Sequence, residues 1–114
     1  MCDIVMYMKQ LFTLLTIIGL SASLYAGDVT ENWNKSCAKC HGADGKGQTK
    51  MGQKLGIKDY TDAKVQAEMK DDAATKAIKE GVKDKEGKTQ MKAAEGLTDI
   101  DVKALVTYIR TFKK

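Results

Sequence analysis

Residues 37–41, Cys-Ala-Lys-Cys-His, place three reactive side chains within five positions of this 114-residue chain. On a helical turn, positions i, i+3 and i+4 lie on one face, so Cys37, Cys40 and His41 can point the same way. The spacing C-x-x-C-H is typical of covalent haem attachment, in which two thiols bond the porphyrin vinyl groups and the imidazole binds the iron. We therefore predict one c-type haem, attached through Cys37 and Cys40, with His41 as its proximal iron ligand.

Three other chemistries use paired cysteines and remain as alternatives. A disulfide between Cys37 and Cys40 would suit an exported protein. A thioredoxin-like redox pair needs a strand leading into it and a βαβ unit, whereas residues 27–114 contain no β-branched strand run. A structural zinc site needs four ligands, and residues 27–114 contain no further Cys or His. Haem attachment is the interpretation that best fits the motif.

The composition excludes several further classes of function. The chain carries a formal net charge of +4, is 43% apolar and 30% charged, and contains no proline, which is the balance of one globular domain. Its single histidine excludes the zinc motif H-E-x-x-H and a bis-histidine haem. Neither a G-x-x-x-x-G-K-[ST] phosphate loop nor a G-x-S-x-G nucleophile elbow is present. Basic and aromatic residues do not alternate, so we expect no nucleic acid partner.

An apolar, uncharged run over residues 11–20 precedes the motif, with Lys9 before it and a small-residue stretch after it. This pattern predicts a secretory signal peptide over residues 1–26, cleaved after Ala26, with Met8 as an alternative start. An uncleaved membrane anchor is the rival interpretation, because residues 10–27 carry no charge over 18 positions. Cys2 falls within the predicted leader. The mature domain is then residues 27–114, in the periplasm.

The segment that leads into the motif, residues 28–40, is predicted to form a helix. Asp28 can cap its start, and Val29, Trp33 and Cys37 fall on one face at i, i+4 and i+8. Trp33 is expected in the core rather than at the edge of the haem. The motif would then lie at the carboxyl end of this helix.

Three further helices are predicted. Two short ones cover residues 61–70 and 72–80, the second ended by Gly81. Thr98 and Asp101 resemble a capping box at the start of the last helix, with Asp in place of Glu or Gln. An apolar stripe then follows at helical spacing: Val102, Leu105, Val106, Ile109 and Phe112.

From the leader, residues 37–41, the glycine-rich segment 41–47, a late methionine and the closing helix, the chain resembles the class I monohaem bacterial cytochromes c. The resemblance covers residues 28–114. It implies an all-α fold of about four helices around one covalently bound haem. It also implies that the first and last helices cross, with Tyr108 or Phe112 filling the contact. Leu55 and Ile57 are expected to line the haem.

The sixth iron ligand is chosen among three methionines of the mature domain. Met69 reads as a core residue in the middle of a helix, since methionine commonly fills gaps there. Met91 lies in a glycine- and lysine-rich loop before the last helix, where the resemblance places the axial methionine. Met51 is the second choice, because it follows His41 by only ten residues in a similar loop. A lysine or an open site is the remaining alternative.

Two features depart from the family. Lys92 follows Met91 where the family often has proline. A proline carbonyl usually accepts the proximal histidine N–H, so a carbonyl from residues 47–54 would have to orient His41 here.

Ligation by His41 and Met91 leaves no free coordination position, so we expect reversible one-electron transfer and not enzymatic turnover. The expected partners are redox proteins, some of them membrane-bound, with no small-molecule substrate; the chain is expected to be monomeric. The lysines are either an ordinary solvated surface or a ring that steers docking on an acidic partner. A haem enzyme or gas sensor with an open sixth position is the alternative function.

Overall fold

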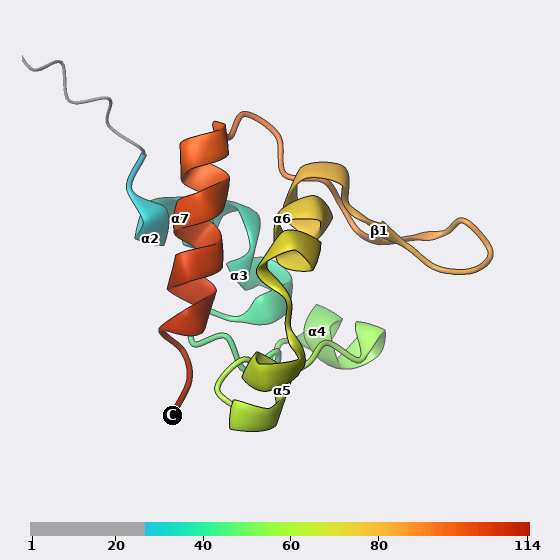
Figure 1. Ribbon diagram of the computed structural model, residues 1–114. Helices are drawn as coiled ribbons and strands as arrows, with labels where there is room; N and C mark the ends of the chain where they lie inside the picture. Colours follow the sequence, from blue (N-terminus) through green and yellow to red (C-terminus); the bar gives the residue numbers. More distant parts are fainter. Residues whose placement is uncertain (1–26) are drawn as a thin grey trace, which may run out of the picture.

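A computed structural model describes residues 27–114 (Figure 1). The predicted signal segment, including Cys2, lies outside the described residues. The described part is mostly helical, which confirms the all-α prediction, although it has six short helices and a small hairpin rather than about four helices. No helix of residues 27–114 is long and apolar enough to cross a membrane. The elements in chain order are α2 (Val29–Ser36), α3 (Ala38–His41), α4 (Lys50–Leu55), α5 (Ala63–Glu68), α6 (Asp71–Glu80), β1 (Val82–Lys83), β2 (Thr89–Met91) and α7 (Asp99–Arg110).

The helix predicted over residues 28–40 is divided in two at Cys37. Asp28 caps α2 as predicted, with its carboxylate accepting from the backbone N–H groups of Thr30 and Glu31. Cys37 has φ −122° and ψ −39°, which ends α2, and α3 starts at the next residue. The motif therefore spans a break, with Cys37 at the junction and His41 at the end of α3.

The segment containing Met51 is helix α4, not the predicted loop. Thr49 explains why a helix starts here, because its hydroxyl accepts from Gly52 N at 2.9 Å as an N-cap. The same hydroxyl donates to the carbonyl of Cys40 at 2.5 Å, which ties α4 to the motif. Gly52 has no room for a side chain, since a Cβ there would lie 2.5 Å from the Cys40 carbonyl oxygen.

The two middle helices are present with shifted boundaries. α5 is shorter than predicted, because Asp62 caps it and Met69 takes an extended conformation just after its end. Met69 is thus not in mid-helix, but it packs against the core as expected. α6 starts at Asp71, one residue earlier than predicted, and stops at Gly81, which has φ +77°.

The segment between α6 and α7, predicted as loop, forms an antiparallel hairpin of β1 and β2 that pairs Val82 with Met91. Asp84 shapes its turn by accepting from the backbone N–H groups of Glu86 and Lys88, both at 2.9 Å. Figure 1 shows this hairpin projecting from the helical body. The prediction missed it because its residues carry little β-branched signal, and pairing, not propensity, makes the strands.

The core forms where α2 and α6 pack on α7 (Figure 1). Trp33 is 1% exposed, which confirms its predicted core position, and Leu105 of α7 is fully buried. The ring centroid of Trp33 lies 5.8 Å from that of Tyr108 and 5.2 Å from that of Phe112. The predicted aromatic contact between first and last helices is confirmed, and both candidates take part. The capping box of Thr98 and Asp101 is also present at the start of α7.

Candidate functional site

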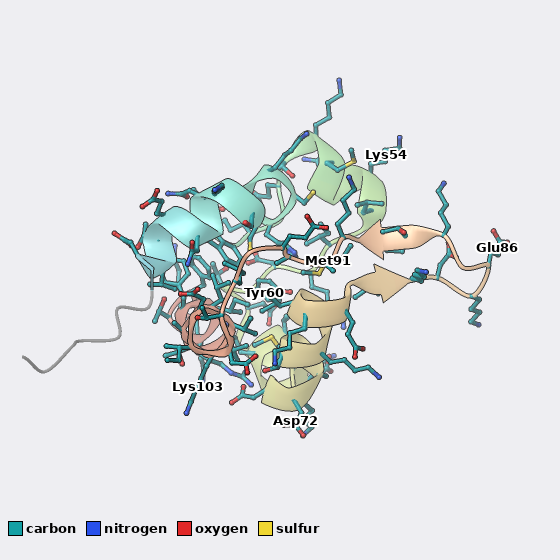
Figure 2. The ribbon with its side chains drawn as sticks, turned by 90° about the horizontal axis from the view of Figure 1, so that it is seen from above. Lys54, Tyr60, Asp72, Glu86, Met91 and Lys103 are labelled. Atoms are coloured by element: carbon teal, nitrogen blue, oxygen red, sulfur yellow. The ribbon has the colours of Figure 1, made fainter. Side chains whose placement is uncertain are left out.

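One cavity lies in the middle of the helical body, with mostly apolar walls contributed by α2, α3, α6, α7 and the end of β2. It contains three of the four predicted site residues: Cys37, His41 and Met91. Figure 2 shows Met91 and Tyr60 toward the centre of the molecule, whereas Lys54 and Glu86 lie at its edge. The full lining is Trp33, Cys37, His41, Tyr60, Ala74, Ala77, Ile78, Met91, Leu105 and Ile109.

Both cysteines of the motif are free thiols, with Cys37 buried and Cys40 half-buried. Burial, together with the nearby Cys40, raises the pKa of Cys37 to about 11. At neutral pH the Cys37 thiol therefore stays protonated. A redox-active pair would instead need a thiolate with a lowered pKa. A protonated thiol, as at Cys37, is the form that can add across a vinyl group.

His41 sits at the carboxyl end of α3 between two aromatic rings. Its ring stacks on Tyr60 with centroids 5.4 Å apart, and it lies 5.7 Å from Trp33. Burial lowers the pKa of His41, so the imidazole is neutral, which is the form that binds metal.

The Nδ1 atom of His41 is buried without a hydrogen-bond partner among the described residues. The expectation that a carbonyl from residues 47–54 orients this ring is therefore not met. The carbonyls of the two residues that flank His41 in the chain accept from other donors: Gly42 O accepts from Trp33 Nε1 at 2.9 Å, and Cys40 O accepts from Thr49. Packing between Tyr60 and Trp33 orients the imidazole instead.

Met91 reaches the cavity from the end of β2, where its backbone is tightly held. A Cβ on Gly81 would lie 2.6 Å from the Met91 carbonyl oxygen and 2.8 Å from Ala93 N, so the chain passes directly over this glycine. Ala94 N also donates to the carbonyl of Ile78 in α6 at 2.8 Å. The end of α6 thus fixes the backbone that carries Met91.

The other two methionines do not line this cavity. Met51 projects from α4 with 41% of its surface exposed. Met69 packs against the core just after α5. Only Met91 of the described methionines shares a cavity with His41.

Tyr60 is a lining residue that the sequence did not single out. Its N–H donates to Gly45 O at 2.9 Å, and its carbonyl accepts from Gln66 Nε2 at 2.6 Å. Gln66, 4% exposed, also donates to the carbonyl of Ile109, so it joins this loop to α7. Burial raises the pKa of Tyr60, which keeps its hydroxyl protonated. No local pattern marks Tyr60, because its role depends on contacts with distant segments.

The wall that α6 contributes consists of Ala74, Ala77 and Ile78, which share one face of this helix at helical spacing. Two of these three side chains are as small as alanine, and Leu105 and Ile109 of α7 complete the apolar lining. Leu55 and Ile57, predicted beside the haem, are not in this lining; Ile57 instead contacts Gly47.

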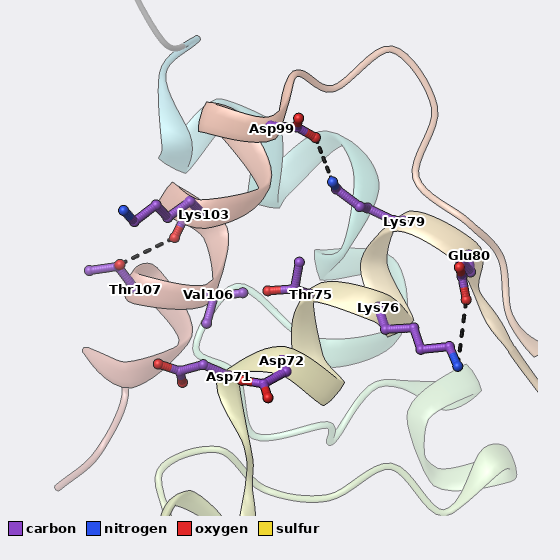
Figure 3. Close-up of a pocket in the computed structure, with 10 residues that line it drawn as sticks. All are labelled: Asp71, Asp72, Thr75, Lys76, Lys79, Glu80, Asp99, Lys103, Val106 and Thr107. Atoms are coloured by element: carbon purple, nitrogen blue, oxygen red, sulfur yellow. Dashed lines mark hydrogen bonds and ion pairs between the residues drawn. The ribbon is translucent and has the colours of Figure 1, made fainter.

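A second depression lies on the outside between α6 and α7 (Figure 3). Its walls carry charges of both signs, including the ion pair of Lys79 and Asp99 at 2.5 Å. None of the motif residues line it. A polar, open depression does not suit an apolar macrocycle, so the inner cavity is the candidate site.

The donor set of the inner cavity fits a c-type haem. The motif offers two thiols for covalent bonds, His41 offers a neutral imidazole, Met91 offers a thioether, and the walls are apolar.

Comparison with known proteins points the same way. Residues 29–113 match the model of the family described as cytochrome c. Among solved structures, the chain is similar to the KustC0563 c-type cytochrome, with 36% identity over 76% of this chain and 99% of that chain and a TM-score of 0.64. A tyrosine-to-phenylalanine mutant of Kustc0563 gives 35% identity over 75% of this chain and 99% of that chain, with a TM-score of 0.62. No curated protein matches the chain.

Proposed function

Since this chain belongs to the cytochrome c family of haem-c electron carriers, we propose that it transfers single electrons between redox proteins of the periplasm, with His41 and Met91 as axial ligands. When bound, the haem supplies reversible one-electron chemistry by cycling its iron between Fe(III) and Fe(II). The observation that carries the proposal is that His41 and Met91 line one cavity, while Met51 lies exposed on α4.

The chain's own residues then have distinct roles. Cys37 and Cys40 would each hold the cofactor through a thioether, with the thiol sulfur and proton added across one vinyl group and no change in redox state. His41 would hold the iron as a neutral imidazole and Met91 as a neutral thioether, a ligand that would favour Fe(II) and raise the reduction potential. Apolar walls from α6 and α7 exclude water and further favour the less charged oxidation state.

If His41 and Met91 both hold the iron, no coordination site would remain for oxygen, peroxide or another small substrate. We therefore propose a carrier and not an enzyme. Rigid attachment of Met91 to the end of α6 supports this role, because ligands that keep their positions in both oxidation states reduce reorganisation.

The ligand assignment is tested by the variants Met91→Ala and Met51→Ala of the haem-loaded protein. We expect the weak long-wavelength Met-to-iron band of the ferric protein to be lost in Met91→Ala and kept in Met51→Ala. The reduced Met91→Ala protein should bind carbon monoxide, and the wild type should not. A band that survives in Met91→Ala would refute the assignment. Rapid carbon monoxide binding by the wild type would favour an open-site haem enzyme or sensor.

We also propose that the partner docks on the basic surface formed by residues 39–58. This stretch has five lysines and one acidic residue, Asp44. None of these lysines takes part in the ion pairs found within residues 27–114. The stretch includes residues 39–41, the last three of the five motif residues, so an acidic partner attracted to it would approach the cofactor. The lysines are Lys39, Lys46, Lys50, Lys54 and Lys58.

Electron-transfer rates with an acidic redox protein test this surface. The double variant Lys50→Glu/Lys54→Glu should lower the second-order rate by about tenfold at low salt, with the difference fading at high salt. Lys76→Glu on α6 is the control and should change the rate little. Equal rates for both variants would show that docking occurs elsewhere.

A further inference from the structure

The first described residue, Gly27, is fastened to the last helix. Its backbone nitrogen donates to Asp101 Oδ1 at 2.8 Å, across 74 positions of the chain. Asp101 lies in the first turn of α7 and is 7% exposed. Its second oxygen accepts from Thr98 N at 3.0 Å. One carboxylate therefore holds both the start of α7 and the residue just before α2.

Asp101 has no cationic side chain as a partner. The ion pairs found within residues 27–114 join Lys76 to Glu80, Lys79 to Asp99, and Arg110 to Asp71. The carboxylate of Asp101 is satisfied by backbone N–H groups and not by a positive charge. A carboxylate with little exposed surface commonly has such a charge beside it.

We propose that removal of the leader supplies this charge: hydrolysis of the bond between Ala26 and Gly27 creates an α-ammonium group that forms an ion pair with Asp101. A water molecule provides the hydroxyl for the Ala26 carbonyl carbon and a proton for the Gly27 nitrogen, and the free amine takes a further proton at neutral pH. The inference rests on the export proposed above.

The surroundings of Gly27 suit an ammonium group. A Cβ on Gly27 would lie 3.5 Å from Asp101 Oδ1 and 3.7 Å from the side-chain oxygen of Asn32. The amide oxygen of Asn32 is therefore a second hydrogen-bond acceptor close to Gly27, beside the carboxylate of Asp101. The same Cβ would be 3.2 Å from the Asn32 nitrogen, which shows how closely the chain passes and favours glycine here. A charge-assisted hydrogen bond is also roughly twice as strong as the neutral one it replaces.

The consequence is an ion pair that forms only after the leader has been removed. α2 carries Trp33 and leads into the motif, and α7 forms the opposite wall of the core. An ion pair between the start of α2 and the first turn of α7 stabilises their crossing. The domain should therefore reach its full stability only once the leader has been removed.

The test compares four haem-loaded proteins purified after export: wild type, a form with one alanine inserted between Ala26 and Gly27, Asp101→Asn, and the combination. Intact mass should show that the wild type begins at Gly27 and that the insertion leaves one extra residue. We expect the insertion and Asp101→Asn each to lower the melting temperature by about 2–6 °C. The melting temperature of the combined variant should be little lower than that of the less stable of the two single variants.

Asp99→Asn is the matched control, because Asp99 lies in the same turn of α7 but pairs with Lys79. Its effect should add to that of the insertion. An insertion that leaves the melting temperature unchanged, or effects of the insertion and Asp101→Asn that add fully, would overturn the ion pair while leaving export and electron transfer intact. A wild-type chain that begins elsewhere than Gly27 would overturn the processing step itself.

Discussion

Substituting Gly81 by alanine should displace Met91 from its position in the cavity. Gly81 has φ +77° and ψ −178°, a backbone region that is essentially restricted to glycine and costs other residues about 1–3 kcal/mol. The new Cβ would also lie 2.6 Å from the Met91 carbonyl oxygen, where side-chain carbons are essentially never closer than 3.0 Å. The strand must therefore move by at least 0.4 Å, the difference between these distances. Overpacking of this kind costs a further 1–3 kcal/mol or so.

Gly87→Ala is the matched control on the same hairpin. Gly87 also has a positive φ, +81°, but a Cβ there meets nothing within 4 Å. Its cost should be limited to the backbone contribution of about 1–3 kcal/mol. Because 1 kcal/mol corresponds to roughly 4–8 °C in a domain of this size, Gly81→Ala should melt at least about 4 °C below Gly87→Ala.

The ferric absorption spectrum distinguishes displacement of Met91 from a general loss of stability. We expect Gly81→Ala to lose or weaken the long-wavelength Met-to-iron band at a temperature where the protein is folded, and to bind carbon monoxide when reduced. Gly87→Ala should keep the band. The reasoning is refuted if Gly81→Ala retains the full band and melts together with Gly87→Ala.

Three further predictions concern the frame of the site. Arg110→Gln removes hydrogen bonds from the guanidinium to Gln66 in α5, to Met69 just after it and to Asp71 at the start of α6. It should lower the free energy of unfolding by about 1.5–3 kcal/mol in urea titrations, whereas Lys113→Gln should change it little. Hydrogen bonds from Thr61 lower the pKa of the Asp59 carboxyl below its ordinary value of 3.8. The stabilisation of the folded state by these bonds is therefore present above pH 3.8 and is lost as the pH falls through the lowered pKa of the folded protein. Acid unfolding monitored by circular dichroism should therefore be shallower in Asp59→Asn, and an unchanged slope would contradict this. Finally, Cys37→Ala/Cys40→Ala should release all haem on denaturation in gels stained for haem, while each single variant keeps one covalent bond.

Local features of the chain could be predicted because their causes are local. The capping residues Asp28 and Thr98 were recognisable from the helix starts that follow them, and Gly81 from the helix that it ends. The core position of Trp33 followed from helical spacing. Each of these depends on contacts within a few positions, so the residue types suffice.

Features that depend on distant contacts were missed or misread. The helix containing Met51 is tied to the motif through the Thr49 hydroxyl, which donates to the carbonyl of Cys40 nine positions earlier. The hairpin required pairing of Val82 with Met91, which neither segment reveals alone. Tyr60 gains its place through hydrogen bonds that reach Gly45 and, through Gln66, α7.

The amino-acid sequence by itself determined the chemistry: two thiols and an imidazole fall within five positions, so that their types and separation alone indicate covalent haem. Only the tertiary structure decided which methionine lines the same cavity as His41, which residues form the rest of that cavity, and where Gly27 is anchored. The physical reason is distance along the chain. Side chains four positions apart are held together by the backbone, whereas His41 and Met91 line one cavity only because packing of α6 and α7 on the core brings the end of β2 to it.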